Sequence, residues 1–272
     1  MKGESNMEAF ACWDQSRNLI RSSNGGWRIG EAVYCHGYSM MDDLVGSKSY
    51  FQQLVLNITG EIPDRKLADW MEACFICVSW PDPRIWCNQM GALAGTSRAS
   101  GISGLSAGLM AADSIMYGPG VIQRCYEFIH AAKQVSEVGT SIEHIIQTHL
   151  RSFKDVPGYA RPIAKGDERV IAMERVSADL GFTPGAHELL AKSISDYLAD
   201  ECDECINFGG YMVAFLADQG FSGKEIEWMV NTAVSSGVQA CYIDASDRPE
   251  GSFLPLRVED VHYEGHEDRD IY

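Results

Sequence analysis

The sequence predicts an all-α protein, and three observations support that class. Eight segments repeat apolar residues at the i, i+3, i+4 spacing of an amphipathic helix. Apolar–polar alternation is confined to residues 30–33 and 258–263, which predicts at most a minor hairpin. No internal repeat and no low-complexity segment interrupts the helical pattern. A chain of 272 residues is long enough to bury a full core in one large domain or two modest ones.

Helix boundaries are marked by proline and glycine. Pro63 and Pro184 lie near the first turns of two predicted helices, where proline is favoured because its missing N–H would have no helical partner. Gly181, Gly220 and Gly223 mark helix ends. The eight predicted helices cover residues 66–78, 105–116, 122–135, 142–153, 169–180, 186–199, 210–218 and 224–243.

Residues 88–119 are unusually rich in Gly, Ala and Ser. Small residues at this density let helices approach closely, so we expect this segment to be central, including at a subunit interface. A glycine-rich phosphate cradle is the alternative interpretation. It would need a Gly-Lys-Ser/Thr sequence and a preceding strand, and the segment has neither. The packing interpretation is therefore favoured.

Charge and composition exclude several classes of function. The net charge of −16 argues against a nucleic-acid partner, which requires a basic face. No apolar run approaches the 18 residues of a membrane span, and the first eight residues do not read as a secretory signal. Nine cysteines without such a signal predict free thiols in a reducing compartment, so we expect a cytoplasmic protein.

Two Cys-x-x-Cys pairs, Cys74/Cys77 and Cys202/Cys205, raise the question of a metal. The first pair follows the helical spacing of its neighbours, and buried cysteine packs as a small hydrophobe. The second pair lies among acidic residues, which makes it the more suitable of the two for binding a cation. A shared tetrahedral zinc and a redox pair both stay open, but we expect no metal site.

One block of sequence carries the most specific signal. Residues 157–162 read Pro-Gly-Tyr-Ala-Arg-Pro and residues 165–169 read Lys-Gly-Asp-Glu-Arg. They resemble the Pro-Gly-Phe/Tyr-Gly-His-Pro and Gly-Asp-Pro-Arg block of the citrate synthase and citryl-CoA lyase superfamily, with arginine in place of the histidine. Other segments resemble the same superfamily in the same order, so the likeness spans nearly the whole chain: 33–39, 54–63, 107–119, 207–221 and 254–265.

This resemblance implies a helical homodimer whose subunits have a large and a small domain. By analogy, the large domain would comprise residues 1–120 and 222–272, and the small domain residues 121–221. The cleft between them would bind an acyl-CoA and a small oxo or carboxylic acid. No further cofactor is implied, because coenzyme A would enter as part of a thioester substrate.

The chain departs from the family at all three positions that move protons. No histidine follows the Gly118-Pro119 turn, the expected aspartate corresponds to Gly209, and the second histidine corresponds to Arg161. Enolising a thioester requires a positioned base, and glycine cannot act as one. Arginine stays protonated near neutral pH, so it cannot act as a base either. The departures predict a rearranged site.

The resemblance also names the residues that would form this site. Arg169 and Arg257 match arginines that bind the acid's carboxylates, the second one lent across the dimer. With Arg161 they would make an anion pocket, because the guanidinium group binds carboxylates through two parallel hydrogen bonds. Tyr117 is the nearest titratable group to the missing histidine and is the candidate proton donor. Exposed or helix-capping arginines are the alternative interpretation of each guanidinium.

Three further residues are candidates for substrate binding. His36 stands where the family has an arginine, although a histidine between tyrosines is more often simply hydrogen-bonded. Asp82 and Arg84 occupy a segment that lines the acid site in relatives, but an ion pair inside a proline-flanked turn would explain them equally well.

These observations predict a citrate synthase-like enzyme that makes or breaks a carbon–carbon bond in an acyl-CoA or a small acid. Two alternatives remain open. The first is a non-catalytic relative that keeps the dimer and the anion pocket. The second is a decarboxylase or eliminase that uses the same pocket and needs no enolising base.

Overall fold

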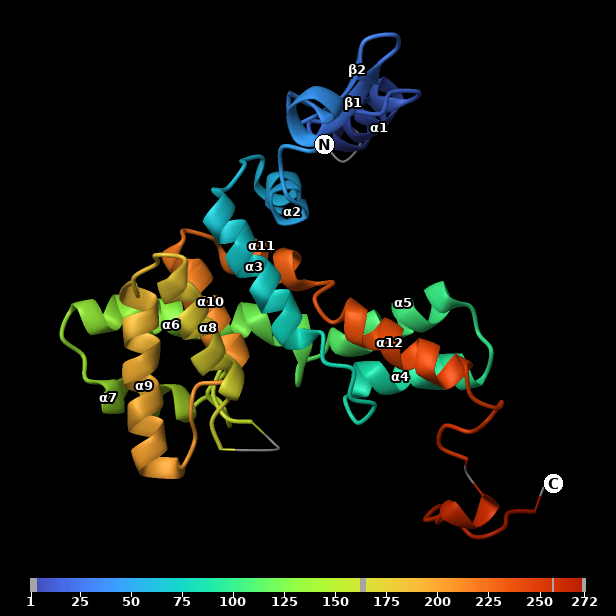
Figure 1. Ribbon diagram of the computed structural model, residues 1–272, viewed down its shortest axis with the longest axis vertical. Helices are drawn as coiled ribbons and strands as arrows, with labels where there is room; N and C mark the ends of the chain where they lie inside the picture. Colours follow the sequence, from blue (N-terminus) through green and yellow to red (C-terminus); the bar gives the residue numbers. More distant parts are fainter. Residues whose placement is uncertain (1–3, 162–164, 256, 271–272) are drawn as a thin grey trace. The chain divides into compact units, whose positions relative to one another are not determined.

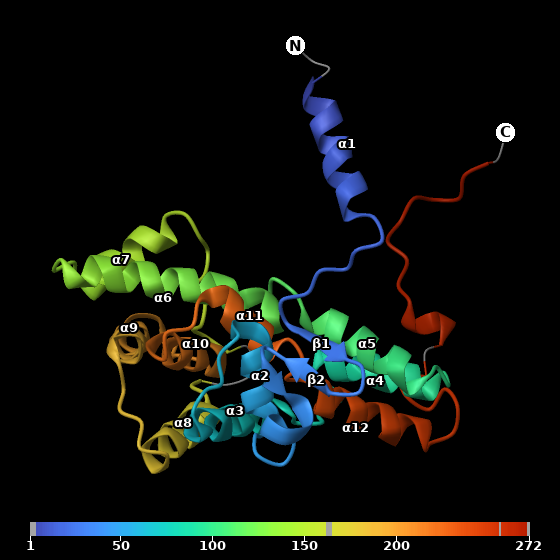
Figure 2. The ribbon, with the colours of Figure 1, turned by 90° about the horizontal axis from the view of Figure 1, so that it is seen from above.

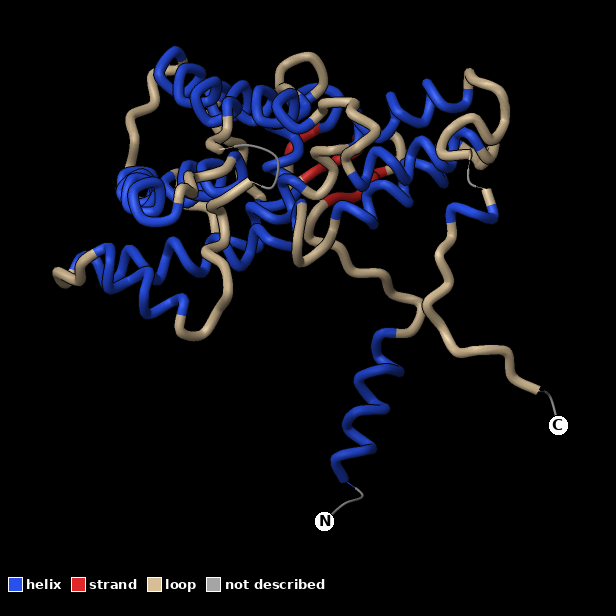
Figure 3. Tube along the Cα trace, turned by 90° about the horizontal axis from the view of Figure 1, so that it is seen from below, coloured by secondary structure: helices blue, strands red, loops and turns tan. Residues whose placement is uncertain are grey.

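The computed structural model describes residues 4–161, 165–255 and 257–270, which contain twelve α-helices and three short strands (Figures 1 and 3). The all-α prediction is therefore confirmed. The chain divides into two compact units, Met1–Asp69 and Trp70–Tyr272. This division does not test the predicted large and small domains, which stay a prediction.

The first unit combines two helices, the start of a third and the small sheet. The strands form an antiparallel meander in the order β1-β2-β3, with Gly25 opposite Cys35. Gly30, with a φ of 78°, lies in the turn between β1 and β2, so the alternation at 30–33 belongs to a real hairpin. The elements are α1 (Glu4–Ser16), β1 (Gly25–Arg28), β2 (Ala32–Cys35), β3 (Tyr38–Ser39), a π-helical turn (Met40–Leu44), α2 (Tyr50–Thr59) and α3 (Arg65–Val78), which continues into the second unit.

Side-chain caps define the ends of these helices. Ser49 and Gln52 form a capping box at the start of α2, and Gly60 ends that helix with a φ of 83°. The carboxylate of Asp64 accepts a hydrogen bond from the Leu67 N–H at 2.9 Å, which marks the start of α3 directly after Pro63. The start predicted from this proline is therefore confirmed.

The named elements of the second unit are all helices in its described residues (Figure 1). Its most buried element is α10, which packs against α6, α8, α9 and α11. Trp70 stacks on Phe215 of α10, with ring centroids 3.8 Å apart, and donates to Ser177 of α8. The elements are α4 (Trp86–Thr96), α5 (Gly101–Ala112), the 3-10 helix η2 (Gly118–Val121), α6 (Ile122–Glu137), α7 (Ile142–Leu150), α8 (Glu168–Asp179), α9 (Ala186–Cys202), α10 (Phe208–Asp218), α11 (Gly223–Val230), α12 (Ser235–Ser246) and the 3-10 helix η3 (Val258–Asp260).

The small residues of 88–119 form a tight bundle of α4, α5 and α12 (Figure 2). A Cβ atom added at Gly95 would lie 2.3 Å from the Tyr242 carbonyl oxygen, and one added at Gly108 would lie 2.4 Å from Val238 Cγ1. No larger side chain fits at these positions without moving a helix. The prediction that small residues permit close packing is confirmed, whereas a role at a subunit interface stays untested.

Three element predictions were wrong. Residues 258–263 begin with η3 and contain no described strand. The helix predicted over 224–243 is two helices, α11 and α12. They are separated by turns at 231–234, where the sequence has neither proline nor glycine. The helix predicted over 105–116 begins at Gly101 and ends at Ala112. None of the described helices is long and apolar enough to cross a membrane.

Candidate functional site

The site is built on the loop 157–161, which is clamped against the start of α10. The Asn207 N–H donates to the Gly158 carbonyl at 3.0 Å, and Tyr159 pairs with Ile206 in an isolated bridge. Gly158 has a φ of 91°, and a Cβ there would lie 2.5 Å from Cys125 Sγ. Only glycine satisfies both the conformation and the space at this position.

Ala160 completes the turn that presents Arg161. Its φ of 66° lies in the left-handed region, which is unfavourable for alanine, and hydrogen bonds hold it there. Its N–H donates to the Cys205 carbonyl at 2.9 Å, and its carbonyl accepts from Asn207 Nδ2 at 3.0 Å. Pro162, the last residue of the predicted block, lies outside the described residues.

Asp167 is the centre of the site. Its side chain is 0% exposed. It caps α8 by accepting from the Arg169 N–H at 3.1 Å, and its other oxygen accepts from the Phe208 N–H, at the start of α10, at 2.9 Å. A carboxylate buried to this degree needs charged or N–H partners, because an uncompensated buried charge is strongly unfavourable.

Both predicted arginines converge on this carboxylate. Arg169 donates to Asp167 from Nε at 2.8 Å and from Nη2 at 2.7 Å, and its guanidinium lies 5.0 Å from the centroid of the Phe208 ring. Arg161 Nη1 lies 3.6 Å from Asp167 Oδ1. Burial alone would raise the pKa of Asp167, but the hydrogen bonds and charge of Arg169 outweigh it, and the pKa is lowered.

Arg161 has a second acidic partner, Glu168. Its Nη1 and Nη2 both donate to the Glu168 carboxylate, the latter at 3.2 Å. This bond raises the pKa of Arg161, so the guanidinium stays charged. Two arginines and two carboxylates thus meet at the start of α8, and their formal charges cancel.

Tyr117 lies just before η2 and faces a mostly apolar cluster. Its hydroxyl is 3.7 Å from Cys87 Sγ, and its ring meets Trp86 edge-on with centroids 5.9 Å apart. Burial raises the pKa of the phenol, while the charge of Arg169 acts in the opposite direction. The tyrosine therefore stays protonated at neutral pH and lies within electrostatic range of the arginine site.

The chain is similar to a citryl-CoA lyase from Hydrogenobacter thermophilus, with a TM-score of 0.79 and 22% identity over 94% of this chain and 98% of that one. It is also similar to ATP citrate lyase from Methanothrix soehngenii, with a TM-score of 0.75 and 17% identity over 96% of this chain and 44% of that one.

A citrate synthase from Thermotoga maritima has a TM-score of 0.64 and 17% identity over 82% of this chain and 60% of that one. The chain has the citrate synthase-like fold. The resemblance identified in the sequence is confirmed at the level of the fold. No family model matches this citrate synthase-like chain, and no curated protein matches its sequence.

Gly209, which the sequence resemblance matches with the aspartate of the citrate synthase superfamily, lies in the first turn of α10. The carboxylate of Asp167 accepts a hydrogen bond from the N–H of the preceding residue, Phe208. Asp167 is a poor replacement base, because its oxygens are engaged and its pKa is lowered. In the sequence, this aspartate is recognisable only as part of a motif.

Sequence reasoning also missed Cys77. It was assigned to helix packing with Cys74, which is buried. Cys77 is only partly buried, and the charges of both Arg169 and Asp167 affect its pKa. Burial is the largest effect and raises the pKa of this thiol, which therefore stays protonated. No sequence signal distinguishes the two cysteines except their different positions around α3.

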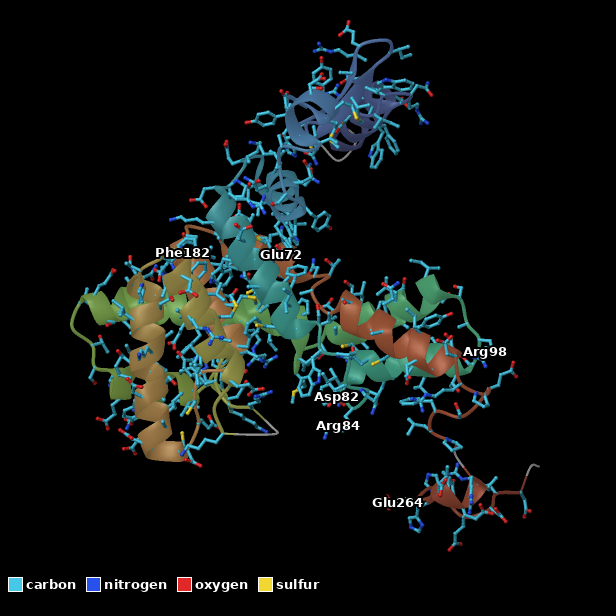
Figure 4. The ribbon with its side chains drawn as sticks, viewed as in Figure 1. Glu72, Asp82, Arg84, Arg98, Phe182 and Glu264 are labelled. Carbon is cyan, nitrogen blue, oxygen red and sulfur yellow. The ribbon has the colours of Figure 1, made fainter. Side chains whose placement is uncertain are left out.

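The other predicted residues do not join this cluster through any described contact. Asp82 and Arg84 form an ion pair inside their own turn, with Nη2–Oδ2 at 2.6 Å (Figure 4). That pair lowers the pKa of Asp82 to about 2. His36 belongs to the first unit, has a φ of 48° and lies close to Gly60. Arg257 is exposed, and its backbone N–H donates to Asp260.

A cavity of about 560 Å³ lies between α6 and α7. Its wall is mostly apolar and includes Phe128, Ile145 and Phe153, with His149 and Arg124 among its polar groups. Arg124 is paired with Asp155 at 3.1 Å. Neither Arg161 nor Arg169 lines this cavity. No group of three or more metal-binding side chains occurs in the described parts of the chain.

Proposed function

We propose that this chain binds a small carboxylic acid at Arg161 and Arg169 and acts in carbon–carbon bond chemistry of a coenzyme A thioester. The convergence of both arginines on the buried carboxylate of Asp167 is the observation that carries the proposal. The fold supports it, because similar structures include a citryl-CoA lyase and an ATP citrate lyase in complex with citrate and coenzyme A.

Asp167 would make the two arginines usable as an anion site. Two guanidinium groups repel each other unless a negative charge lies between them. Asp167 provides that charge without being displaceable, because its side chain is fully buried and also bonded to a backbone N–H. Its bonds to Arg169 use Nε and Nη2, so in the described structure Nη1 of that residue stays available to a ligand. Arginine forks of this kind bind carboxylates in defined orientations.

Cleavage of a citryl-CoA-like thioester illustrates what these residues would do. The hydroxyl proton of the substrate passes to water, the carbon–carbon bond breaks, and its electron pair forms the enolate of the shorter thioester. Arg161 would donate to the oxygen that becomes a carbonyl, and Arg169 would hold a carboxylate. Tyr117, whose phenol burial keeps protonated, would then protonate the enolate carbon, and the resulting phenolate would recover the proton that the substrate hydroxyl gave to water.

The absence of a carboxylate at Gly209 favours a second candidate function. Without that base, the site would keep its ligand affinity and lose turnover, as in an acid-binding relative that is not an enzyme. Decarboxylation or elimination at the same pocket is the third candidate, because such reactions do not require the enolising base.

The proposal includes a homodimer and a cytoplasmic location. A dimer would let one subunit lend Arg257 to the other, as the resemblance implies. Nine cysteines, with no disulfide among the described residues, suit a reducing compartment. Analytical ultracentrifugation would measure the assembly, and a monomer at micromolar concentration would contradict this part of the proposal.

Product detection tests the function directly. Citryl-CoA is supplied to the protein and acetyl-CoA is measured by mass spectrometry, while the reverse assay supplies acetyl-CoA and oxaloacetate and measures citrate. Arg161→Ala and Arg169→Ala are each expected to lower kcat/KM by at least about 100-fold. Arg175→Ala is the matched control, because Arg175 is an exposed arginine on the same helix, α8. Citrate binding without turnover in either direction would favour the acid-binding relative.

A further inference from the structure

The partner of Arg161 differs in kind from the partner of Arg169. Arg161 has a side chain that is 10% exposed, yet both of its terminal nitrogens donate to Glu168, whose side chain is 70% exposed. Arg169 instead donates to Asp167, whose side chain is fully buried. One guanidinium of the site is thus held by a fixed internal carboxylate, and the other by a carboxylate on the surface.

The geometry explains why Arg161 reaches outward. Both oxygens of Asp167 already accept from Arg169, and one also accepts from the Phe208 N–H. The remaining distance from Arg161 Nη1 to Asp167 is 3.6 Å, which is too long for a hydrogen bond. The planar fork of Arg161 therefore pairs with the two oxygens of Glu168. This is the arrangement that a bound carboxylic acid would make with the same fork.

The bond to Glu168 is the more easily exchanged of the two. Ion pairs with an exposed partner contribute little net stability, because the exposed side chain is well solvated and loses rotamer freedom when it is held. A ligand carboxylate can replace Glu168 on Arg161 without leaving a buried charge unpaired, since Glu168 moves into water. Asp167 has no such alternative.

We propose that Glu168 is an internal competitor that occupies the carboxylate-binding fork of Arg161 and yields it to the incoming acid. This inference rests on the proposed function, because it assumes that the same fork takes the ligand. It makes Glu168 a specificity-determining residue. Acids with two or more carboxylates, which can engage Arg169 while they displace Glu168, are favoured over monocarboxylates.

The place of Glu168 in the helix allows a clean substitution. It is the first residue of α8, directly after the capping residue Asp167. Proline is well tolerated at that position, and the resembling Gly-Asp-Pro-Arg block carries one there. Glu168→Pro therefore removes the competing carboxylate while it preserves the helix start, and Glu168→Gln removes the charge alone.

A purely structural role is the rival explanation. A carboxylate in the first turn of a helix stabilises the helix dipole whether or not it competes with a ligand. Glu143, an exposed first-turn glutamate of α7, is the matched control for this effect. Glu143→Gln is expected to alter thermal stability slightly and acid affinity not at all.

Calorimetric titration with citrate and with acetate tests the proposal on the full-length protein at low ionic strength. Glu168→Gln and Glu168→Pro are expected to lower the Kd for citrate about three- to tenfold. The ratio of the Kd for acetate to the Kd for citrate should be smaller in both variants than in the wild-type protein. Phenylglyoxal labelling read by mass spectrometry needs no ligand. It should modify Arg161 several-fold faster in both variants, with Arg175 unchanged as the internal reference.

The outcomes separate this inference from the proposed function. Equal citrate affinity in the wild-type protein and both variants would overturn the role of Glu168 and leave the acid-binding function standing. If the wild-type protein and both variants all fail to bind citrate, although Arg161 is labelled faster in the variants, the proposed function and the competitor role are both overturned.

Discussion

Helices α8 and α9 of the second unit begin in a similar way, but the charged groups around their first residues differ. Each leaves backbone N–H groups that need acceptors, and each uses an aspartate whose side chain is no more than 9% exposed. At α8 the aspartate is Asp167, which also accepts from the first N–H of α10. At α9 it is Asp218, the last residue of α10, which accepts from the N–H groups of His187 and Glu188 at 2.9 Å each. Helix α10 therefore joins both corners.

The difference lies in the charges around the aspartates. Asp167 is surrounded by two arginines, and its pKa is lowered. The α9 corner has no arginine in its described contacts, and Glu188 there has a pKa raised to about 7, mainly by burial and further by Asp218. The α9 corner is a structural joint. The α8 corner carries an excess of hydrogen-bond donors, which is what an anion site requires.

The largest expected effect comes from Asp167→Asn. Removing the charge leaves two partly buried guanidinium groups without their common partner, so the free energy of unfolding should fall by about 3 kcal/mol. Because the pKa of Asp167 is lowered by folding, its contribution is present above the unfolded value of about 4 and is lost as the pH falls below it. Urea unfolding between pH 3 and 7 measures both effects. Asp179→Asn, on the exposed end of α8, is the control, and an equal loss there would contradict the comparison.

Asp218→Ala should have the next largest effect. It removes the hydrogen-bond acceptor at the start of α9 and the 2.7 Å bond to His187, so the free energy of unfolding should fall by about 2 kcal/mol. It should also lower the pKa of Glu188, because Asp218 contributes to raising it. Citrate affinity should stay unchanged, since the joint does not belong to the anion site. The control is Asp244→Ala, which removes the exposed ion-pair partner of Arg248. It is expected to change the free energy of unfolding by less than about 0.5 kcal/mol.

Glu188→Gln sharpens the contrast through its pH dependence. A carboxyl whose pKa is raised by folding stabilises the folded state while protonated, and this contribution is lost as the pH rises from about 4 to about 7. The glutamine variant resembles the protonated form. It should match the wild-type melting temperature near pH 4 and exceed it above pH 7. A variant that is less stable than the wild type at pH 8 would show that Glu188 has a cationic partner.

The smallest expected effect is at Ala160. Glycine relieves the unfavourable left-handed conformation but adds freedom to the unfolded chain, so Ala160→Gly should gain about 0.5 kcal/mol. Thermal unfolding would detect this as a small rise in the melting temperature. A clear loss would mean that the alanine methyl group packs in a way that outweighs its conformation, and that the turn presenting Arg161 is not strained.

Most of the helical architecture could be predicted from periodicity, because amphipathic helices record their buried face in the sequence. Exceptions have physical reasons. Helix α4 contains so many small residues that no apolar stripe stands out, and the break between α11 and α12 has no proline or glycine. The small sheet of β1, β2 and β3 is too short for alternation to reveal more than one turn.

The site was predictable in part. Resemblance placed Arg161 and Arg169 together, but it gave no indication that Glu168 would hold the fork of Arg161, because that depends on the exposed rotamer of one glutamate. Helical spacing likewise gave no sign that the charges of Arg169 and Asp167 affect the pKa of Cys77. The roles of His36, Asp82, Arg84 and Arg257 in binding stay predictions.

A crystal structure of the protein with citrate would test the central claim most directly. The account predicts one carboxylate of citrate on the fork of Arg161, with Glu168 displaced into solvent, and a second carboxylate on Nη1 of Arg169. Citrate bound elsewhere, with the Arg161–Glu168 pair intact, would contradict it.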